Sequence, residues 1–202
     1  MGLNKREVVI DADFFNKFTE KDPSGVLFLM IMDEMNTMPV MHEYVYSDEL
    51  MGNITTAGLV KMGHIKIYKY QDYINKNNET DYKEKFRRAY KDFNYEDFAG
   101  DVFTYRQCQQ SLGEIRSTLM AWYMNIGIFM SDDGGAKQYI ETKLNSAKRR
   151  INVYNVYDTL HQIALKDTRN VKWTDIKATA KSSFEFSLDK YTEIRNLWCK
   201  QK

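Results

Sequence analysis

The sequence predicts an α/β fold in which helices cover both faces of a parallel β-sheet. Short apolar segments such as residues 8–10 and 128–130 are typical of buried strands, because they are fully apolar rather than alternating. A longer segment, residues 112–126, carries its apolar side chains on one helical face. Strand-like and helix-like segments alternate several times along the chain, and this order favours a parallel sheet.

The remaining elements follow from the same patterns and from residues that break them. We expect strands at residues 8–10, 65–68, 128–130 and 151–154, and helices near 26–35, 45–60, 83–92, 112–126, 136–148 and 157–165. Ser24 can cap the first of these helices. Pro39 is expected to interrupt the chain after it, because proline lacks a backbone donor.

Length and composition favour one main domain. The chain has 202 residues, 43% of them hydrophobic, which is enough for one well-buried core. We expect a domain over residues 1–166 with a helical insertion at about 75–110, and a helical C-terminal extension over 167–202. The formal net charge is only +1, so any attraction to nucleic acid must come from a local basic patch.

Features of the sequence indicate a cytoplasmic protein without membrane association. The longest apolar run, residues 26–32, is too short to span a bilayer, and the N-terminus lacks the apolar stretch of a signal peptide. Cys108 and Cys199 have no CxxC spacing and are interpreted as free thiols in a reducing compartment.

Acidic residues follow two of the expected strands. Asp11 and Asp13 come directly after residues 8–10, Asp132 and Asp133 come just after residues 128–130, and Glu114 lies at the start of a helix. In open parallel sheets, function collects beyond the carboxyl ends of the strands. Clustered carboxylates repel and are costly to desolvate, so a fold that gathers them normally supplies a cation. Oxygen ligands without His or Cys favour Mg²⁺ or Mn²⁺.

Each acid also has a structural explanation when it is taken alone. Asp13 suits a helix N-cap, and residues 132–135 suit a turn followed by a cap. Glu114 is favoured by the helix dipole in a first turn, and residues 48–49 suit a solvated helix face. The joint pattern favours a functional site, because the acids follow apolar strands or begin the helices beside them.

Taken in order, these segments resemble the acidic motifs of PIN-domain nucleases. Residues 111–115 are similar to the Gly-Glu form of the third motif in one branch of that family, and residues 128–133 to its Ser/Thr-Asp-Asp ending. The other matching segments are residues 8–13 and residues 45–50 with 63–67. The resemblance covers about residues 7–165. The stretch between Tyr70 and Ser111 is longer than in compact members, and the tail beyond Lys166 has no counterpart.

The resemblance implies a Rossmann-like three-layer α/β/α sandwich with a central parallel sheet. It also implies Mg²⁺- or Mn²⁺-dependent hydrolysis of phosphodiester bonds, with an endoribonuclease expected first and single-stranded RNA expected before DNA. Many members of the family are toxins paired with an antitoxin, and many form homodimers, so both kinds of protein partner are expected.

The resemblance also assigns roles to the acids. Asp11, Glu49, Glu114 and one or both of Asp132 and Asp133 would hold one or two divalent ions. Asp13 would be a further ligand or would orient Asp11. Glu43 competes with Glu49 for the second acidic position, and Glu49 is preferred because it precedes Leu50 in the expected helical context.

Candidate substrate contacts lie in the expected insertion. Its basic run consists of Lys83, Lys85, Arg87, Arg88 and Lys91. Phe86 and Tyr90 are interleaved, and phosphate contacts together with base stacking would suit single-stranded RNA. The alternative is a solvated amphipathic helix whose acids Glu84 and Asp92 offset its charge. Ser131 could donate a hydrogen bond to a metal ligand or to a phosphate.

Two other interpretations are open. Residues 8–15 also resemble the opening of haloacid-dehalogenase-type phosphatases, in which Asp11 would be a nucleophile and Asp13 an acid. That chemistry expects further Ser or Thr and Lys residues for which we find no place, and it leaves Glu114 without a role. The second alternative is a non-catalytic PIN-like module that binds RNA or protein. All four acidic positions are occupied here, which argues against a degenerate site.

Overall fold

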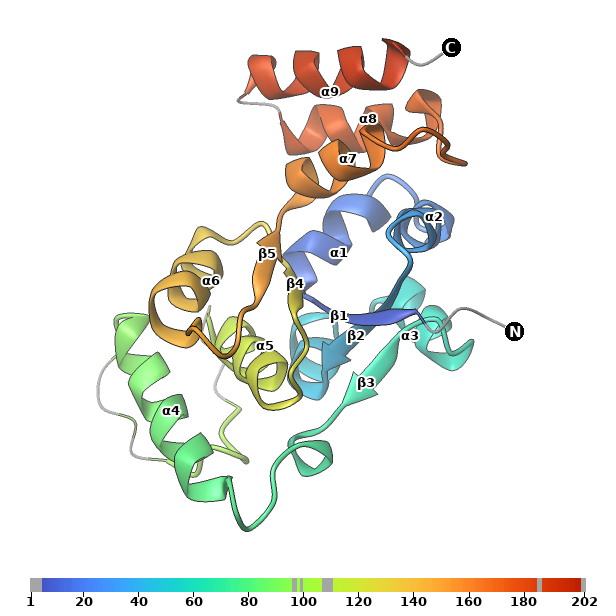
Figure 1. Cartoon of the computed structure of the whole chain (residues 1–202). Coiled ribbons are helices and arrows are strands. Elements are labelled where there is room, and N and C mark those ends of the chain that lie inside the picture. Colours follow the sequence, from blue (N-terminus) through green and yellow to red (C-terminus); the bar gives the residue numbers. More distant parts are fainter. Residues whose placement is uncertain (1–4, 96–97, 99, 107–110, 185–186, 201–202) are drawn as a thin grey trace.

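A computed structural model describes residues 5–95, 98, 100–106, 111–184 and 187–200 (Figure 1). Within these residues, five parallel strands form one sheet in the order β3-β2-β1-β4-β5. They are β1 (Arg6–Ile10), β2 (Thr37–His42), β3 (Lys66–Tyr68), β4 (Ile128–Met130) and β5 (Asn152–Tyr154). The expected α/β fold with a central parallel sheet is therefore confirmed.

Helices surround this sheet. The α-helices are α1 (Ala12–Thr19), α2 (Val26–Glu34), α3 (Ile54–Lys61), α4 (Glu79–Asp92), α5 (Leu112–Tyr123), α6 (Gly134–Tyr139), α7 (Val156–Ala164), α8 (Trp173–Ser183) and α9 (Leu188–Lys200). Short turns of other helix types are η1 (Val45–Glu49), η2 (Tyr70–Asp72) and η3 (Ile140–Leu144). Of the described helices, none is both long and apolar enough to cross a membrane.

The sheet separates two apolar layers. Val8 and Ile10 of β1 point into the layer that contains α1, α2 and α7, whereas Val9 points into the layer that contains α4, α5 and α6. This alternation follows from the two-residue period of a strand. Because β1 is buried on both faces, all of its inner residues are apolar, and the arrangement is a three-layer sandwich.

Strand β2 was not expected from the sequence. Pro39 was interpreted as a break, but it lies inside this strand opposite Val8 of β1. Strand β3 pairs with β2 only from Val40 onward, so at Pro39 one side of β2 has no strand neighbour. Proline is tolerated in a strand at such an edge position.

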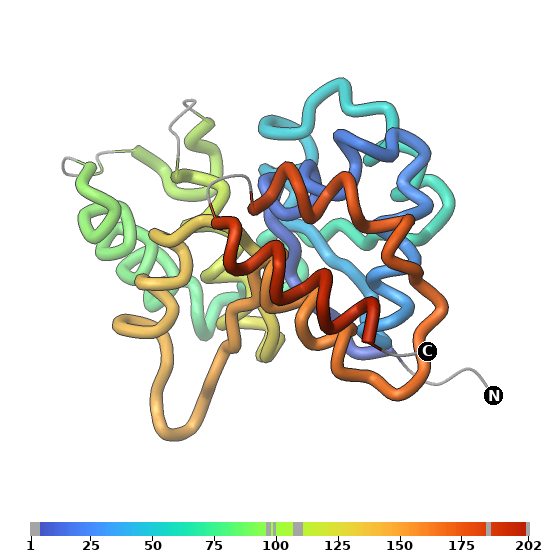
Figure 2. Tube along the Cα trace, turned by 90° about the horizontal axis from the view of Figure 1, so that it is seen from above, coloured from blue at the N-terminus to red at the C-terminus, as the bar shows by residue number. Residues whose placement is uncertain are grey.

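The C-terminal residues belong to the core on the α1 side. Ile176, Ala180, Ile194 and Trp198 are buried in the same apolar cluster as Val8 and Ile10 of the sheet. Figure 2 shows α8 and α9 side by side over the molecule. The expected helical extension over residues 167–202 thus contains the helices α8 and α9, which pack against the main domain, while residues 167–172 before α8 are not helical.

The segment between β3 and α5 packs against the opposite face. Helix α4 lies against α5, and its Tyr82 and Phe86 are fully buried in the second apolar cluster. Residues 96–97, 99 and 107–110 of the expected insertion lie outside the described residues, and so does Cys108. Cys199 is a free, exposed thiol.

Candidate active site

A cleft of about 620 Å³ opens beyond the carboxyl end of β1. Its lining consists of Asp11, Ala12, Asp13, Asn16, Tyr44, Asp48, Glu49, Met51, Arg106, Glu114 and Asp133. Strand β1 lies between β2 and β4, where the strand order reverses, and this is the usual place for a ligand in such sheets. The structure thus brings together five acids that the sequence singled out: Asp11, Asp13, Glu49, Glu114 and Asp133.

Asp11 is the most deeply placed of these acids, with only 2% of its surface exposed. One carboxylate oxygen accepts the Ala12 N–H at 2.7 Å, so Asp11 is the N-cap of α1. The other accepts the Ser131 hydroxyl at 2.8 Å. Burial raises the pKa of Asp11 to about 6, against the lowering effect of these two hydrogen bonds.

Ser131 connects the ends of the neighbouring strands β1 and β4. Its hydroxyl donates to Asp11 at the end of β1 and accepts the backbone N–H of Asp133 at 3.0 Å. Both partners fix the position of the oxygen, and the residue is buried. Ser131 was expected to donate a hydrogen bond either to a metal ligand or to a phosphate. In the structure it donates to Asp11, an acidic residue of the cleft.

Glu49 reaches the cleft from the end of η1, beside the first turn of α5. The backbone N–H of Gly113 donates a hydrogen bond to its carboxylate. Desolvation of this carboxylate, together with the charges of Asp11 and Asp13, raises the pKa of Glu49 to about 7. A Cβ atom on residue 113 would lie only 2.0 Å from Oε1 of Glu49, so only glycine leaves room for this arrangement.

Glu114 contributes a buried carboxylate with an unsatisfied oxygen. The residue is 9% exposed, and its Oε2 has no hydrogen-bond partner among the described residues. Desolvation raises the pKa of Glu114 to about 9, with further contributions from the charges of Asp11 and Glu49. A buried polar atom without a partner is costly, and a bound ion, a water or a catalytic role are among the explanations for such a group.

The neighbouring residues Asp132 and Asp133 face different surroundings. Asp133 lines the cleft, and its Oδ1 accepts the Ala136 N–H at 2.8 Å as the N-cap of α6. Asp132 is not part of the lining, because its Oδ1 accepts the Val156 N–H at 3.0 Å at the start of α7. Adjacent side chains on extended backbone point in opposite directions. The sequence left open whether one or both of these residues serve the site; Asp133 is the one that lines the cleft, and a metal-binding role for either stays a prediction.

The two glutamates that competed for the second acidic position are also separated. Glu49 lines the cleft. Glu43 does not, and its Oε1 lies 4.0 Å from Nη2 of Arg106. Asp13 lines the cleft from the first turn of α1, where Asp11 rather than Asp13 caps the helix. The N-cap explanation considered for Asp13 therefore belongs to Asp11.

The carboxylates share a cleft without forming a closed ligand cage. As the side chains stand, no three His, Cys, Asp or Glu residues in the described part of the chain are placed to hold one metal ion. The oxygen chemistry of the cleft nevertheless suits a hard divalent cation, since burial and neighbouring negative charges raise the pKa values of three of its carboxylates, those of Asp11, Glu49 and Glu114.

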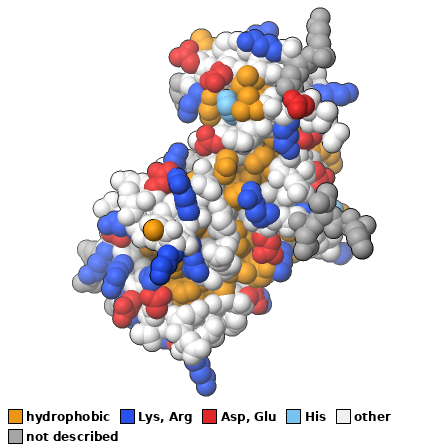
Figure 3. All heavy atoms as spheres, viewed as in Figure 1, with side chains coloured by type: hydrophobic (Ala, Val, Ile, Leu, Met, Phe, Trp, Pro, Cys, Tyr) orange, Lys and Arg blue, Asp and Glu red, His pale blue; other side chains and the backbone are white. Residues whose placement is uncertain are grey.

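The basic run on α4 lies outside the cleft, and several of its side chains are paired with acids. Lys83, Lys85 and Arg88 form ion pairs with Glu79, Asp81 and Glu84 along the same helix. Figure 3 shows acidic side chains among the cationic ones over this part of the surface.

The aromatic residues of this helix cannot stack on bases. Phe86 is fully buried and Tyr90 is 5% exposed, so both belong to the core. The expected stacking role is wrong, because the interleaved aromatic residues form the inner face of an amphipathic helix. Phosphate contacts by Lys83, Lys85, Arg87, Arg88 and Lys91 remain a prediction, and none of these residues lines the cleft.

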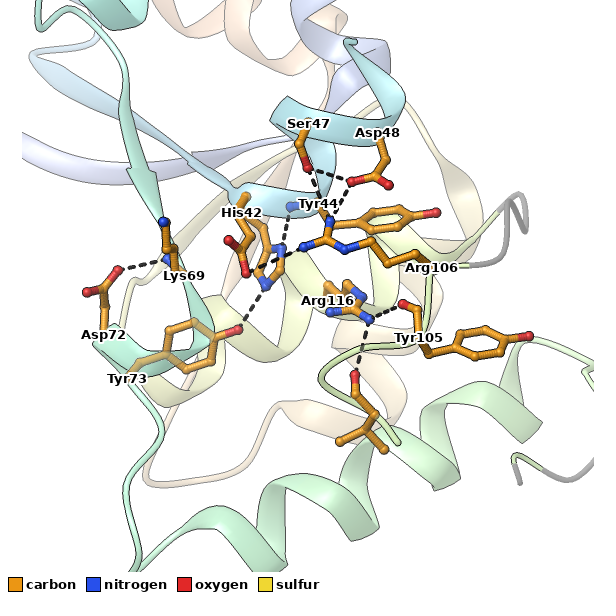
Figure 4. A network of polar contacts seen from close by, with 12 residues as sticks. His42, Tyr44, Ser47, Asp48, Lys69, Asp72, Tyr73, Tyr105, Arg106 and Arg116 are labelled. Carbon is orange, nitrogen blue, oxygen red and sulfur yellow. Dashed lines mark hydrogen bonds and ion pairs between the residues drawn. The ribbon is translucent and has the colours of Figure 1, made fainter. Parts of the chain in front are cut away.

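Sequence reasoning missed Arg106 and Arg116. Arg106 is the cation in the described lining of the cleft, and Arg116 is a buried arginine beneath it (Figure 4). Neither belongs to an acidic motif, and no spacing pattern connects residue 106 with η1. Gly113, by contrast, belongs to the Gly-Glu pair that the sequence singled out. Only the structure shows that its missing side chain leaves room for Glu49.

The chain was compared with family models, with curated proteins and with solved structures. None of these three comparisons gave a match to the chain.

Proposed function

We propose that this protein is a divalent-metal-dependent nuclease that hydrolyses phosphodiester bonds, with single-stranded RNA as its substrate. The observation that carries the proposal is the buried Oε2 of Glu114, which has no partner among the described residues and belongs to a cleft that it shares with Asp11, Glu49 and Asp133. The ordered resemblance to the acidic motifs of PIN-domain nucleases gives the reaction class. A protein antitoxin and a homodimer are parts of the same proposal.

The energetics of the cleft support a cation. Asp11, Glu49 and Glu114 each hold a raised pKa, first because burial penalises their charged forms and then because their charges repel. A fold that keeps three such groups together loses stability when they ionise. A divalent ion among them would remove the repulsion and supply the partner that Glu114 Oε2 lacks.

The acids of the cleft would bind the metal ion. Asp11, Glu49, Glu114 and Asp133 would hold the ion, with Asp13 at the mouth of the same cleft. When bound, Mg²⁺ or Mn²⁺ supplies a polarised water and neutralises charge on the phosphate.

Two further residues would act through these ligands. Ser131 holds Asp11 in place through its hydroxyl, and Gly113 gives Glu49 access to the N-terminus of α5. Both would serve positioning rather than chemistry, because neither carries a charged oxygen into the cleft.

An activity assay tests the proposal. Purified protein is incubated with end-labelled single-stranded RNA and DNA of the same sequence, with Mg²⁺, with Mn²⁺ or with EDTA. We expect metal-dependent cleavage of the RNA, its loss in Asp11→Asn and Glu114→Gln, and its retention in Asp132→Asn. Asp132→Asn is the matched control, because it removes an equivalent charge one residue from the cleft. Full cleavage by Asp11→Asn, or cleavage in EDTA, would overturn the proposal.

A further inference from the structure

The acidic cleft contains a cation supplied by the segment between α4 and α5. Among the described residues that line it are six acids and one cation, Arg106, whose side chain is 43% exposed. Arg106 also lines a neighbouring hollow of about 650 Å³, together with Tyr46 and Lys69. Its guanidinium therefore lies between the carboxylates of the cleft and a second opening, whose lining holds Lys69 together with the acids Glu43 and Asp48.

Weak, exposed contacts hold this guanidinium at the rim. Nη1 of Arg106 donates to Asp48 Oδ2 at 2.6 Å and to Ser47 Oγ at 3.2 Å, both on η1 (Figure 4). Nη2 lies 4.0 Å from Glu43. An exposed ion pair contributes little free energy, so an incoming anion can replace Asp48 as the partner.

The backbone that carries Arg106 is held much more firmly. Arg116 on α5 is 1% exposed, and its Nη2 donates to the carbonyl oxygens of Val102 at 3.1 Å and Tyr105 at 2.6 Å. Its guanidinium lies 5.1 Å from the ring centre of Tyr44. Tyr105 directly precedes Arg106. Arg116, which lies on the same helix as Gly113 and Glu114, therefore holds the backbone next to Arg106 in place.

The Arg106 guanidinium beside the carboxylates has the chemistry to bind a phosphodiester. A nucleic-acid strand entering a cleft of carboxylates is repelled unless a cation meets its phosphates. The planar guanidinium matches phosphate oxygens through two parallel hydrogen bonds. Because the Arg106 side chain is 43% exposed, it can leave Asp48 and turn to a phosphate while its backbone stays in place.

We infer that Arg106 binds a backbone phosphate of the single-stranded RNA substrate next to the carboxylates, with Arg116 as a positioning residue and Asp48 as the partner that the phosphate displaces. This inference rests on the proposed function and adds the residue that recognises the substrate backbone.

Binding of labelled oligouridylate tests it without cleavage. All variants carry Asp11→Asn, and affinity is measured by fluorescence anisotropy at several salt concentrations. Arg106→Gln should weaken binding about tenfold and reduce the slope of log affinity against log salt by about 0.7, the value for one phosphate contact to a single strand. Arg106→Lys should lose less. Arg195→Gln, an exposed arginine on α9, is the matched control and should change neither quantity.

The Asp48→Asn variant separates binding from a structural role. If Arg106 binds phosphate, removing its competitor strengthens RNA binding severalfold, opposite in sign to Arg106→Gln. If Arg106 only clamps η1, both variants weaken binding, and the inference is overturned. Equal affinities for Arg106→Gln and Arg195→Gln overturn it as well, while the nuclease proposal stands. No salt-dependent binding by the Asp11→Asn protein itself would overturn the proposed substrate and this inference together.

Discussion

The Glu49 carboxylate occupies the space that a side chain on residue 113 would need, and Gly113 leaves that space open. The position of a Cβ atom on residue 113 lies 2.0 Å from Oε1 of Glu49 and 2.5 Å from its Cδ. The glycine N–H in turn donates a hydrogen bond to the same carboxylate. The first turn of α5 is therefore shaped to receive a carboxylate, which is the use expected of a helix N-terminus.

Gly113→Ala should separate stability from function. The clash involves the flexible end of Glu49, so the fold tolerates it, and alanine in a helix is favoured over glycine by up to about 1 kcal/mol. We expect an unchanged or higher melting temperature together with a loss of metal affinity of about tenfold or more, because Glu49 must leave its place. Calorimetric titration with Mn²⁺ and thermal unfolding measure the two effects.

Gly58→Ala is the matched control for this substitution. Gly58 lies inside α3, and a Cβ atom there meets nothing within 4 Å. It should raise stability similarly and leave Mn²⁺ affinity unchanged. Equal Mn²⁺ affinities in the two variants would show that the position of Glu49 has no part in binding the ion.

Ser131→Ala should weaken the site through Asp11. The substitution removes the hydroxyl that stabilises the charged form of Asp11, so the pKa of Asp11 rises further above about 6. It also leaves the Asp133 N–H without its acceptor, and the free energy of unfolding should fall by about 1–3 kcal/mol. Urea unfolding and Mn²⁺ titration at two pH values measure both effects. A variant whose Mn²⁺ affinity depends on pH as the wild type does would contradict the coupling.

Metal-free protein should lose stability as pH rises. The folded pKa values of Asp11 and Glu114, about 6 and about 9, lie above those of unfolded carboxylic acids, which are about 4. The folded state therefore binds more protons than the unfolded state between about pH 4 and pH 9, and the free energy of unfolding falls through that window. Stability is highest below about pH 4 as far as these two groups are concerned.

Glu114→Gln measures this contribution, because the amide cannot ionise. In EDTA, the variant should become more stable than the wild type as pH rises from about 5 to about 8.5. Added Mg²⁺ should stabilise the wild type increasingly over the same range, since binding displaces protons. A constant stability difference between the two proteins across this range would contradict the raised pKa of Glu114.

Much of the site could be predicted because its chemistry follows directly from strand ends. Val8–Ile10 is apolar and β-branched, so the carboxyl end of the strand and the position of Asp11 could be placed from sequence. The same reasoning placed the turn that holds Ser131 and Asp133 after β4. Parallel strands that are neighbours in a sheet end on the same side, so the two groups had to approach.

Other features depended on contacts that periodicity does not encode. Pro39 concealed β2, because sequence does not reveal which side of a strand lacks a neighbour. The aromatic residues of α4 could not be assigned to core or surface without the partner helix α5. The opposite directions of Asp132 and Asp133 depended on the start of α7, and the role of Arg106 depended on a loop anchored by Arg116.

Direct measurement of Mn²⁺ binding tests the central claim, that carboxylates distant in sequence form one cation site. Electron paramagnetic resonance of free Mn²⁺ at neutral pH, with protein in excess, gives the bound fraction. We expect the wild type and Asp132→Asn to bind Mn²⁺ alike, and Asp11→Asn and Glu114→Gln to bind at least about tenfold more weakly. Wild-type protein that binds no Mn²⁺, or Asp11→Asn and Glu114→Gln variants that bind it as the wild type does, would contradict the account.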